Sequence, residues 1–538
     1  MRATSQMALT ALAMMIPIAL SSGPVAAFPS SPIRVCDDPA VQEVLGMCPD
    51  DSGGVIVLTT LELKSHLDRI DAAGNSRWGC AEANALTSAD GVDCMIPDGS
   101  GGLFLCWSSQ LPDQFRYAQH FDRDGNSLWG TGVLLGSHPE IVMRAGGGVP
   151  DGSGGLYVLH SRWDATFSTE RLVLDHIGAA GSPVWPLGSV EVSAAPGNQY
   201  PVSAATDGAG GLVLTWSAGN STAVRLQRFD ASGTALWGSG GMLSPSAGAA
   251  LLIVSDGAQG IIGVWNPTVT STLLAQRWNS AGAPQWNPNG VPLAFGTTGN
   301  SLMGWVADGR GGAIAAWIEG ATTVRTQRID ALGQTRWAPN GATLSTATNQ
   351  KSMGHASPDG RGGASFAWAE LEGGNYELHG QQIDSLGAVR VSGGVPLTST
   401  SANETFGWTA SDGAGGAYVA WSDAWAGPGD VWLAHLPAAS PTTSVAPGVG
   451  HGLQLSAPRP NPTSVPFHVS LSLAEGRGGS LELWDVSGRL VDDVALAPQG
   501  GGLHEFVWQP RRELAPGAYW LRVRQSGAEP VQRLVIVR

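Results

Sequence analysis

Hydrophobic residues in this chain come in short runs separated by glycine-rich turns, and the arrangement returns every 48 to 56 residues. Residues 212–216 form a short continuous apolar run, as expected of a strand buried on both faces. Residues 324–329 alternate between apolar and polar, as expected of a half-buried strand. No part of the repeat has helical spacing. The pattern therefore predicts an all-β chain.

The most regular element of the repeat is a turn of the form Asp-Gly-x-Gly-Gly. It begins at Asp98, Asp151, Asp207, Asp308, Asp359 and Asp412, with variants at Asp50 and Asp256. A tryptophan stands nine residues after the Asp in six copies: Trp107, Trp216, Trp265, Trp317, Trp368 and Trp421. Glycine accepts the positive φ of a tight hairpin without steric cost, so each Asp is interpreted as a structural turn residue. Calcium ligation is the alternative, although one carboxylate per turn supplies few ligands.

A second signature follows in the same register and reads Gln-Arg-x-Asp-x-x-Gly-x-x-x-Trp in its fullest form, from Gln327 to Trp337. Its tryptophan recurs at Trp78, Trp129, Trp185, Trp237, Trp286 and Trp337, and the seventh copy has Val391. A fixed register favours packing between sheets over a carbohydrate-stacking platform. We expect Trp237, Trp286 and Trp337 to lie buried between neighbouring units.

Each unit supplies about four strands in about fifty residues, the size of a propeller blade. Eight Asp turns within residues 28–436 thus predict an eight-bladed β-propeller, with a β-solenoid as the alternative. The eighth unit stops near Leu436, after its third strand. Residues 32–35 precede the first unit and are expected to add the missing outer strand, which would protect the sheet edges.

The Asp-x-x-Gly-x-x-x-Trp element resembles the tryptophan-docking repeat of quinoprotein-type eight-bladed propellers. In that family the tryptophan packs between blades, and some members are dehydrogenases. The present chain has no Cys-x-x-Cys-His haem motif and no adjacent-cysteine pair. The resemblance therefore implies the fold, and no cofactor is expected.

A second domain is predicted after a linker rich in Pro, Ser and Thr at residues 437–456. Residues 457–538 contain Pro-Asn-Pro, Asp-Val-Ser-Gly-Arg and Ala-Pro-Gly-Ala-Tyr among alternating strands, which predicts a small β-sandwich. This order of motifs resembles the type A C-terminal sorting domain of the type IX secretion system and the related FlgD-like immunoglobulin-like fold. The resemblance implies export by that machinery. A plain immunoglobulin-like spacer is the alternative.

The N-terminus predicts export. Arg2, an apolar run over 7–20 and small residues at 25–27 are typical of a signal peptide at residues 1–27. No later run is long and apolar enough to cross a bilayer, so the mature chain is expected to be secreted or held at the outer cell surface. All five cysteines lie within residues 36–106, where export permits disulfides, but their odd number leaves the pairing open.

Composition narrows the function without naming a ligand. The net charge of −15 and the lack of a basic face argue against nucleic acid. No catalytic motif and no metal-binding motif stands out. The connections between second and third strands vary, and variable loops on a rigid scaffold are the usual place for recognition. The residues proposed there for binding a glycan or protein are Trp163, Asp164, Tyr376, Asp423 and Trp425. The chain is interpreted as a surface or secreted binding or structural module, with an extracellular propeller enzyme acting on polysaccharide as the alternative.

Overall fold

The structure is a computed structural model in which the chain divides into two compact units, Met1–Ala438 and Ala439–Arg538. None of its described segments forms a helix with the length and hydropathy needed to cross a bilayer. The predicted signal peptide at residues 1–27 lies outside the described residues. These are 31–36, 42–61, 64–87, 91–108, 116–135, 142–163, 168–186, 188–194, 197–219, 224–238, 240–244, 251–267, 272–294, 299–345, 347–391, 393–398, 404–423, 429–438, 454–455, 467–473, 479–485, 489–496, 502–508, 510, 514–524 and 531–536.

Repeated four-stranded antiparallel sheets build the first unit, and eight are present among its described residues. We number them by the repeat that forms them. Sheet 1 contains β2 (Gln42–Pro49), β3 (Val55–Leu61), β4 (Lys64–Ile70) and β5 (Ala81–Thr87), and sheet 2 contains β6 (Gly91–Pro97), β7 (Leu103–Ser108), β8 (Arg116–Phe121) and β9 (Val133–Leu135). Sheet 3 contains β10 (Val142–Pro150), β11 (Leu156–Trp163), β12 (Glu170–Ile177) and β13 (Ser189–Glu191). Sheet 4 contains β14 (Gln199–Thr206), β15 (Leu212–Ala218), β16 (Val224–Phe229) and β17 (Met242–Leu243).

Sheet 5 contains β18 (Leu252–Ser255), β19 (Ile261–Trp265), β20 (Leu274–Trp278) and β21 (Val291–Pro292). Sheet 6 contains β22 (Asn300–Ala307), β23 (Ala313–Glu319), β24 (Thr323–Ile329) and β25 (Ala342–Ser345). Sheet 7 contains β26 (Lys351–Pro358), β27 (Ala364–Glu372), β28 (Asn375–Ile383) and β29 (Val395–Pro396). Sheet 8 consists of β30 (Thr405–Ser411), β31 (Ala417–Ser422), β32 (Val431–Leu436) and β1 (Ile33–Arg34).

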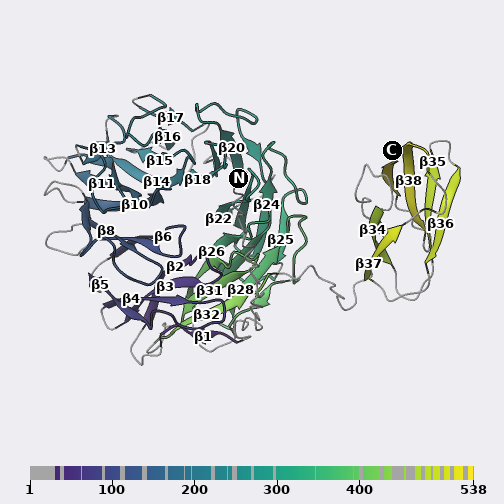
Figure 1. Ribbon diagram of the computed structural model, residues 1–538, viewed down its shortest axis with the longest axis horizontal. Coiled ribbons are helices and arrows are strands. Elements are labelled where there is room, and N and C mark those ends of the chain that lie inside the picture. The colour runs from purple at the N-terminus through teal and green to yellow at the C-terminus, as the bar shows by residue number, and fades with distance from the viewer. Residues whose placement is uncertain are drawn as a thin grey trace, which may run out of the picture. The chain divides into compact units, whose positions relative to one another are not determined.

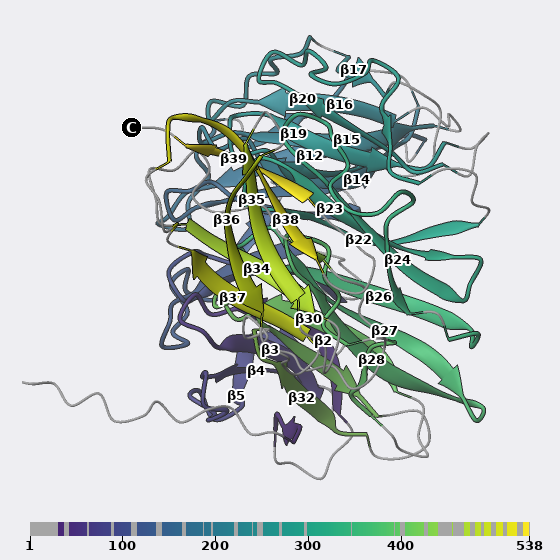
Figure 2. The same cartoon turned by 90° about the vertical axis from the view of Figure 1, so that its right-hand side faces the viewer.

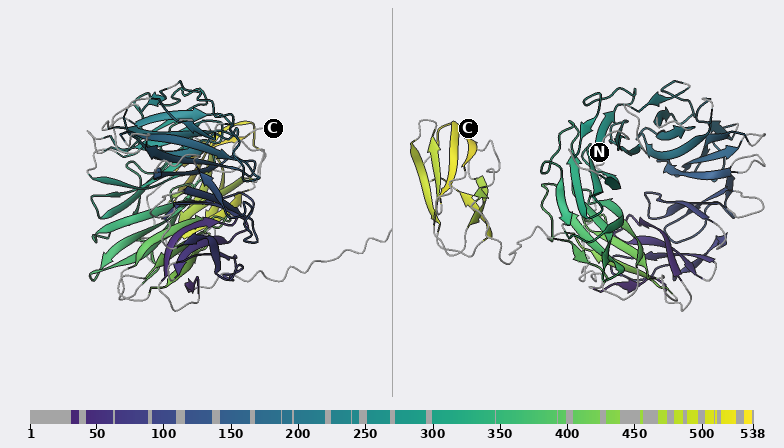
Figure 3. Two further views of the ribbon diagram at one scale, coloured as in Figure 1. Left: turned by 90° about the vertical axis from the view of Figure 1, so that its left-hand side faces the viewer. Right: turned by 180° about the vertical axis from the view of Figure 1, so that it is seen from behind.

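The eight sheets follow one another around a ring, an arrangement consistent with a β-propeller (Figure 1; Figure 3 shows it from behind). The first strand of each sheet packs against the first strands of the sheets before and after it, and β30 of sheet 8 packs against β2 of sheet 1. The cycle is therefore closed.

Closure uses both ends of the unit, as the sequence predicted. Ile33 and Arg34 of β1 pair with Leu433 and Trp432 of β32, so the N-terminal segment supplies the outer strand of sheet 8. Arg34 also forms an ion pair with Asp430. A disulfide between Cys36 and Cys80 ties the end of this segment to sheet 1, whereas Cys48, Cys94 and Cys106 are unpaired.

Each Asp turn is held together by its own carboxylate. In sheet 4, Oδ1 of Asp207 accepts hydrogen bonds from the backbone N–H groups of Ala209 and Gly211, both at 2.8 Å. The same pair of bonds, to the second and fourth residues after the Asp, recurs in the other seven sheets. The aspartate replaces the backbone partners that a tight turn leaves unsatisfied.

The tryptophan of the second signature reaches the next sheet. Trp286 and Trp337 are 9% and 7% exposed, and Trp237 is only partly buried. The indole N–H of Trp286 donates to the carbonyl oxygen of Ala331 at 3.2 Å, in the following sheet. A Cβ on Gly333 would lie 2.7 Å from the Trp286 ring, so the ring packs directly onto a glycine that has a φ of +78°. The tryptophan of one copy of the signature thus packs on the glycine of the next copy.

Two antiparallel sheets form the second unit. One contains β33 (Gln454–Leu455), β34 (Phe467–Leu473) and β37 (Gly502–Trp508). The other contains β36 (Leu490–Leu496), β35 (Gly479–Asp485), β38 (Gly517–Arg524) and β39 (Val531–Ile536). Phe467 and Trp508 of the first sheet share one buried cluster with Leu483 and Leu521 of the second. The core therefore lies between the two sheets.

Candidate functional site

The proposed binding residues that the structure describes all lie at one end of their sheets. Trp163 is the last residue of β11, Tyr376 is the second residue of β28, and Asp423 directly follows β31. We call this end, where second and third strands join, the hairpin face. The Asp turns lie at the opposite end, which we call the turn face. Asp164 and Trp425 lie outside the described residues.

The structure brings only part of the predicted set together. Tyr376 and Asp423 belong to sheets 7 and 8, which are neighbours, whereas Trp163 belongs to sheet 3. Trp163 is half-buried and pairs with Glu170 across its hairpin. The five residues therefore do not form a single described site.

Asp423 has a defined local role in closing the hairpin of sheet 8. Its Oδ1 accepts the backbone N–H of Asp430 at 2.6 Å, and its Oδ2 accepts the indole N–H of Trp432 at 3.0 Å. Asp430 in turn pairs with Arg34. The carboxylate thus holds Asp430 and Trp432, two residues that contact Arg34 of the N-terminal strand.

Tyr376 belongs to the hairpin formed by the nine-residue strands β27 and β28, which run side by side (Figure 2). Its side chain is half-buried and packs against an apolar cluster shared by sheets 7 and 8. Its carbonyl oxygen accepts the backbone N–H of Glu404 at 3.1 Å. The hairpin of sheet 7 is therefore anchored on sheet 8.

The opposite side of this hairpin carries a polar group that sequence reasoning missed. Cross-strand pairing places His379 opposite Trp368, and Glu377 opposite Glu370. Paired residues of an antiparallel sheet point to the same side, and alternation adds Glu372 to that side. Trp368 belongs to a core cluster with residues of sheet 6. The polar group therefore extends from the junction of sheets 6 and 7.

Glu370 is the buried centre of the group. Its carboxylate accepts hydrogen bonds from Asn349 Nδ2 at 3.1 Å and from the indole N–H of Trp368 at 3.3 Å, and Lys351 Nζ lies 3.5 Å away. Burial lowers the pKa of Lys351, and the negative charge of Glu370 opposes that effect. This arrangement is a buried ion pair whose partners are satisfied by further donors and acceptors.

Glu372 and His379 form the more accessible edge of the same group. His379 Nε2 lies 3.0 Å from Glu372 Oε1, and the imidazole stacks on Trp368 with ring centroids 5.9 Å apart. One ligand atom from each of Glu370, Glu372 and His379 lies within 4.8 Å of the others, a spacing that a metal ion can bridge. A cation there would share Glu370 with Lys351, so the residues fit a metal poorly.

One sequence signal pointed toward this group. Lys351 is one of two lysines, with Lys64, in the whole chain. Its partners could not be inferred, because they depend on the register of β27 and β28 and on the packing of the preceding connection.

Comparison with known proteins identifies no family. No family model matches the chain, and no curated protein matches its sequence. Among solved structures, the chain is similar to a prolyl endopeptidase at 10% identity and a TM-score of 0.43, over 71% of this chain and 55% of that one. The WD40 domain of Toxoplasma gondii coronin aligns at 11% identity and a TM-score of 0.38, over 66% of this chain and 86% of that one.

A quinoprotein alcohol dehydrogenase-like protein from Bacteroides thetaiotaomicron aligns at 9% identity and a TM-score of 0.31, over 56% of this chain and 65% of that one. The chain thus spans little more than half the length of the prolyl endopeptidase. TM-scores below 0.5 are too low to support any inference about the chemistry of this chain.

Proposed function

We propose that the chain is an exported protein of the outer cell surface or medium, in which an eight-bladed β-propeller acts as a binding or structural module. The observation that supports this function is the unequal length of the hairpins on the hairpin face. β27 and β28 have nine residues each, whereas β19 and β20 have five. The Asp turns at the other end keep one geometry. A constant scaffold that carries one variable face is the arrangement used for recognition.

The long hairpin of sheet 7 is the first place to test ligand binding. Near the end of this hairpin Tyr376 offers a half-buried aromatic ring on one side and Glu372 an exposed carboxylate on the other, so a glycan or a polar protein surface that covers the end of the hairpin would contact both. A glycan array probed with the mature first unit should give hits that are lost in Tyr376→Ala and Glu372→Ala. Leu386→Ala is the matched control, because Leu386 is 77% exposed and lies on the turn face. Hits that persist in both variants would rule out this hairpin.

We propose further that the second unit is an immunoglobulin-like sorting domain read by type IX secretion. Two contacts among its described residues support the proposal. The Tyr519 hydroxyl donates to the carbonyl oxygen of Ala515 at 2.9 Å, as in the tyrosine corner of immunoglobulin-like sandwiches. Asp485 closes the Asp-Val-Ser-Gly-Arg turn by accepting the backbone N–H of Arg489 at 3.0 Å.

Deletion of residues 457–538 in a host with type IX secretion tests the sorting role. The truncated protein should stay in the periplasm with its first unit folded, and a reporter fused to residues 457–538 should be exported. Normal export of the truncated protein would leave only the spacer interpretation.

An extracellular enzyme acting on polysaccharide is the second candidate function. The observation that favours it is the carboxylate–imidazole pair of Glu372 and His379 on the hairpin face. Release of reducing ends from a polysaccharide panel by the mature chain, abolished in Glu372→Gln, would establish this activity.

A further inference from the structure

Seven of the eight Asp turns on the turn face have one of two side-chain partners, and the first kind is an arginine. The turn of sheet 7 instead has Gln382 at the matching position, which donates to Ser365 and to the carbonyl oxygen of Leu436. In sheet 4, Nε and Nη2 of Arg228 donate to Oδ2 of Asp207 at 3.0 and 2.8 Å. Its Nη1 reaches the carbonyl oxygen of Ser280 in sheet 5 at 2.9 Å. Arg69, Arg277 and Arg328 bridge their own Asp turn to the following sheet in the same way. A built-in guanidinium therefore fills each of these junctions.

The second kind of junction replaces the arginine with a histidine and a tyrosine. In sheet 3, Nε2 of His176 lies 2.9 Å from Oδ2 of Asp151, and the imidazole stacks on Tyr157 with centroids 4.1 Å apart. The Tyr157 hydroxyl donates to the carbonyl oxygen of Gly210 at 2.6 Å. Sheet 8 has the same arrangement in Tyr418, His435 and Asp412.

The residue six positions after the Asp changes together with the side chain that pairs with the Asp. The position six residues after the Asp is Ile56, Val213, Ile262 or Ile314 where the partner is an arginine. It is Phe104, Tyr157 or Tyr418 where the partner is a histidine. The imidazole pairs with the Asp of its own sheet. A histidine junction therefore has no guanidinium that donates to a carbonyl oxygen of the next sheet.

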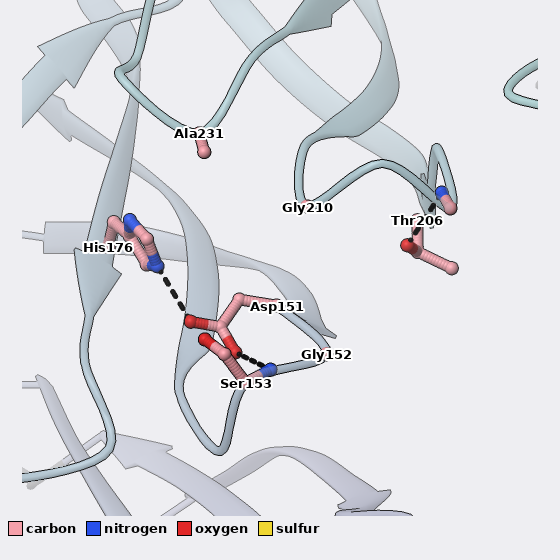
Figure 4. Close-up of a pocket in the computed structure, with 8 residues that line it drawn as sticks. Asp151, Gly152, Ser153, His176, Thr206, Gly210 and Ala231 are labelled. Atoms are coloured by element: carbon pink, nitrogen blue, oxygen red, sulfur yellow. Dashed lines mark hydrogen bonds and ion pairs between the residues drawn. The ribbon is translucent and has the colours of Figure 1, made fainter.

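A pocket of about 380 Å³ opens at the histidine junction between sheets 3 and 4 (Figure 4). Asp151, His176, Gly210 and Ala231 are among the residues that line it. Gly210 and Ala231 correspond in the repeat to Gly362 and Ser385.

Those two positions mark where an arginine head group lies in an intact arginine junction. A Cβ on Gly362 would lie 3.2 Å from Cζ of Arg328, and Arg328 Nη1 donates to the carbonyl oxygen of Ser385 at 3.3 Å. The pocket beside His176 therefore occupies the space that a guanidinium fills elsewhere in the same molecule.

The walls of the pocket suit a cation. Burial on its own would raise the pKa of Asp151, but hydrogen bonds from His176 and from the amides of Ser153 and Gly155 outweigh burial and hold that pKa below its usual value. The carboxylate is therefore ionised at neutral pH. Asp207 receives two N–H groups from a charged guanidinium, whereas the Asp151 carboxylate receives one N–H from an imidazole and a side-chain hydrogen bond from Ser153, neither of which is a guanidinium.

The carbonyl oxygen of Ala231 also lacks the second donor that its counterparts have. It accepts the indole N–H of Trp185 at 3.0 Å, whereas the matching oxygen of Ser280 accepts both Trp237 Nε1 and Arg228 Nη1. An acceptor and a carboxylate thus face the space that a guanidinium fills in an arginine junction.

We propose that this pocket binds the guanidinium group of an arginine side chain presented by a partner protein or peptide. That group would take the place of the arginine that the arginine junctions of the same chain contain. A pocket of about 580 Å³ lies between the Asp turns of sheets 8 and 1, the other tyrosine–histidine junction. Asp412 and Gly53, the counterparts of Asp151 and Gly210, are among the residues that line it, so it is included in the test. The proposal goes beyond the function proposed above and does not depend on it, since it concerns the turn face.

Saturation-transfer NMR on the mature full-length chain tests the proposal, with Nα-acetyl-arginine amide as the probe. We expect transfer to be strongest at the Cδ protons, next to the guanidinium. The isosteric but uncharged Nα-acetyl-citrulline amide should bind at least about tenfold more weakly, because it lacks the charge-assisted hydrogen bonds to the carboxylate.

Swapping the two kinds of junction provides matched variants. Tyr157→Val with His176→Arg rebuilds the sheet 4 arrangement and should lower binding, and adding Tyr418→Ile with His435→Arg should lower it further. Val213→Tyr with Arg228→His should create a new site and increase binding. Thermal unfolding of each variant verifies that it is folded. Equal binding of the arginine and citrulline probes, or unchanged binding in the folded quadruple variant, would overturn the proposal.

Discussion

At the scale of single residues, the repeat is held together by side chains whose polar atoms and rings point at the neighbouring copy. Trp286 packs on Gly333 and donates to the carbonyl oxygen of Ala331. Trp337 repeats the arrangement on Gly387, where an added Cβ would lie 2.7 Å from the ring. The tryptophan contributes buried area, and the glycine removes the Cβ that would push the ring away.

Truncation of a docking tryptophan should be costly. Trp286→Ala removes a nearly buried indole and leaves a cavity, so we expect the free energy of unfolding to fall by about 3–5 kcal/mol. Denaturant titration followed by fluorescence measures the change. Leu332→Ala is the control, since Leu332 is 77% exposed and its loss should change stability by less than about 0.5 kcal/mol. Equal effects of the two substitutions would contradict the docking role.

The Asp turns make stability depend on acid. Burial alone would raise the pKa of Asp412, but hydrogen bonds from His435 and from the amides of Ala414 and Gly416 outweigh it and lower that pKa. A carboxyl group with a lowered folded pKa stabilises the protein above the unfolded pKa, near about 4, and this stability is lost as the pH falls through the folded value. We therefore expect the unfolding midpoint to drop steeply below about pH 4.

Asp412→Asn tests that expectation. Asparagine keeps an oxygen for the two turn amides but has no charge to lose, so the variant should be less stable near neutral pH and show a shallower loss in acid. Asp98 and Asp151 also have lowered pKa values, so the slope should shrink without vanishing. An unchanged slope between about pH 6 and pH 3 would exclude Asp412 as a contributor.

At the scale of elements, the weak point of any closed cycle is the junction that the chain itself does not connect. Here β1 adds to β32 through two residue pairs, and Val35 N–H donates to the carbonyl oxygen of Val431 at 2.9 Å. A strand of two residues buries little surface area by itself. The disulfide from Cys36 to Cys80 fastens the same segment to sheet 1, and the Tyr418 hydroxyl donates to Gly53 across the junction at 2.8 Å.

Removing that disulfide should loosen the closure. Cys36→Ser with Cys80→Ser should lower stability by about 2–4 kcal/mol, and proteolysis should begin near residue 36. Unfolding of the parent protein with and without reductant gives an independent measurement. Reductant should have no further effect on the double variant. A parent protein that is insensitive to reductant would show that closure does not depend on this bond.

The strand pattern and the turns were predictable because they depend on neighbours in sequence. An Asp and glycines within five residues determine each turn, and a short apolar run or an alternation of apolar and polar residues predicts each strand. Pairing over longer distances was not predictable in the same way. Cys36 and Cys80 are 44 residues apart, and nothing in their spacing selects this pair among five cysteines. The polar group around Glu370 escaped prediction for the same reason, because the register of two strands decides which of their carboxylates share a side.

At the scale of the whole molecule, each of the two units has a core of its own. The cores of the first unit lie between neighbouring sheets, whereas the second unit buries one cluster between its two sheets. The variable hairpins thus belong to the first unit, and the proposed sorting motifs belong to the second. This separation suits a protein in which one part binds and the other directs export.

Such a division predicts two independent folding units. Residues 28–438 and 439–538 expressed separately should each unfold cooperatively. Their midpoints should equal those of the two units in the intact chain, because neither core needs residues of the other.

Trp508→Ala distinguishes the unfolding transitions of the two units. Trp508 is 4% exposed within the core of the second unit, so its truncation should lower the stability of that unit by about 3–5 kcal/mol. Calorimetry of the full-length variant should then show one transition shifted and the other unchanged. A shift of both transitions would mean that the units stabilise one another, which would contradict the proposal that the second unit is a separable export signal.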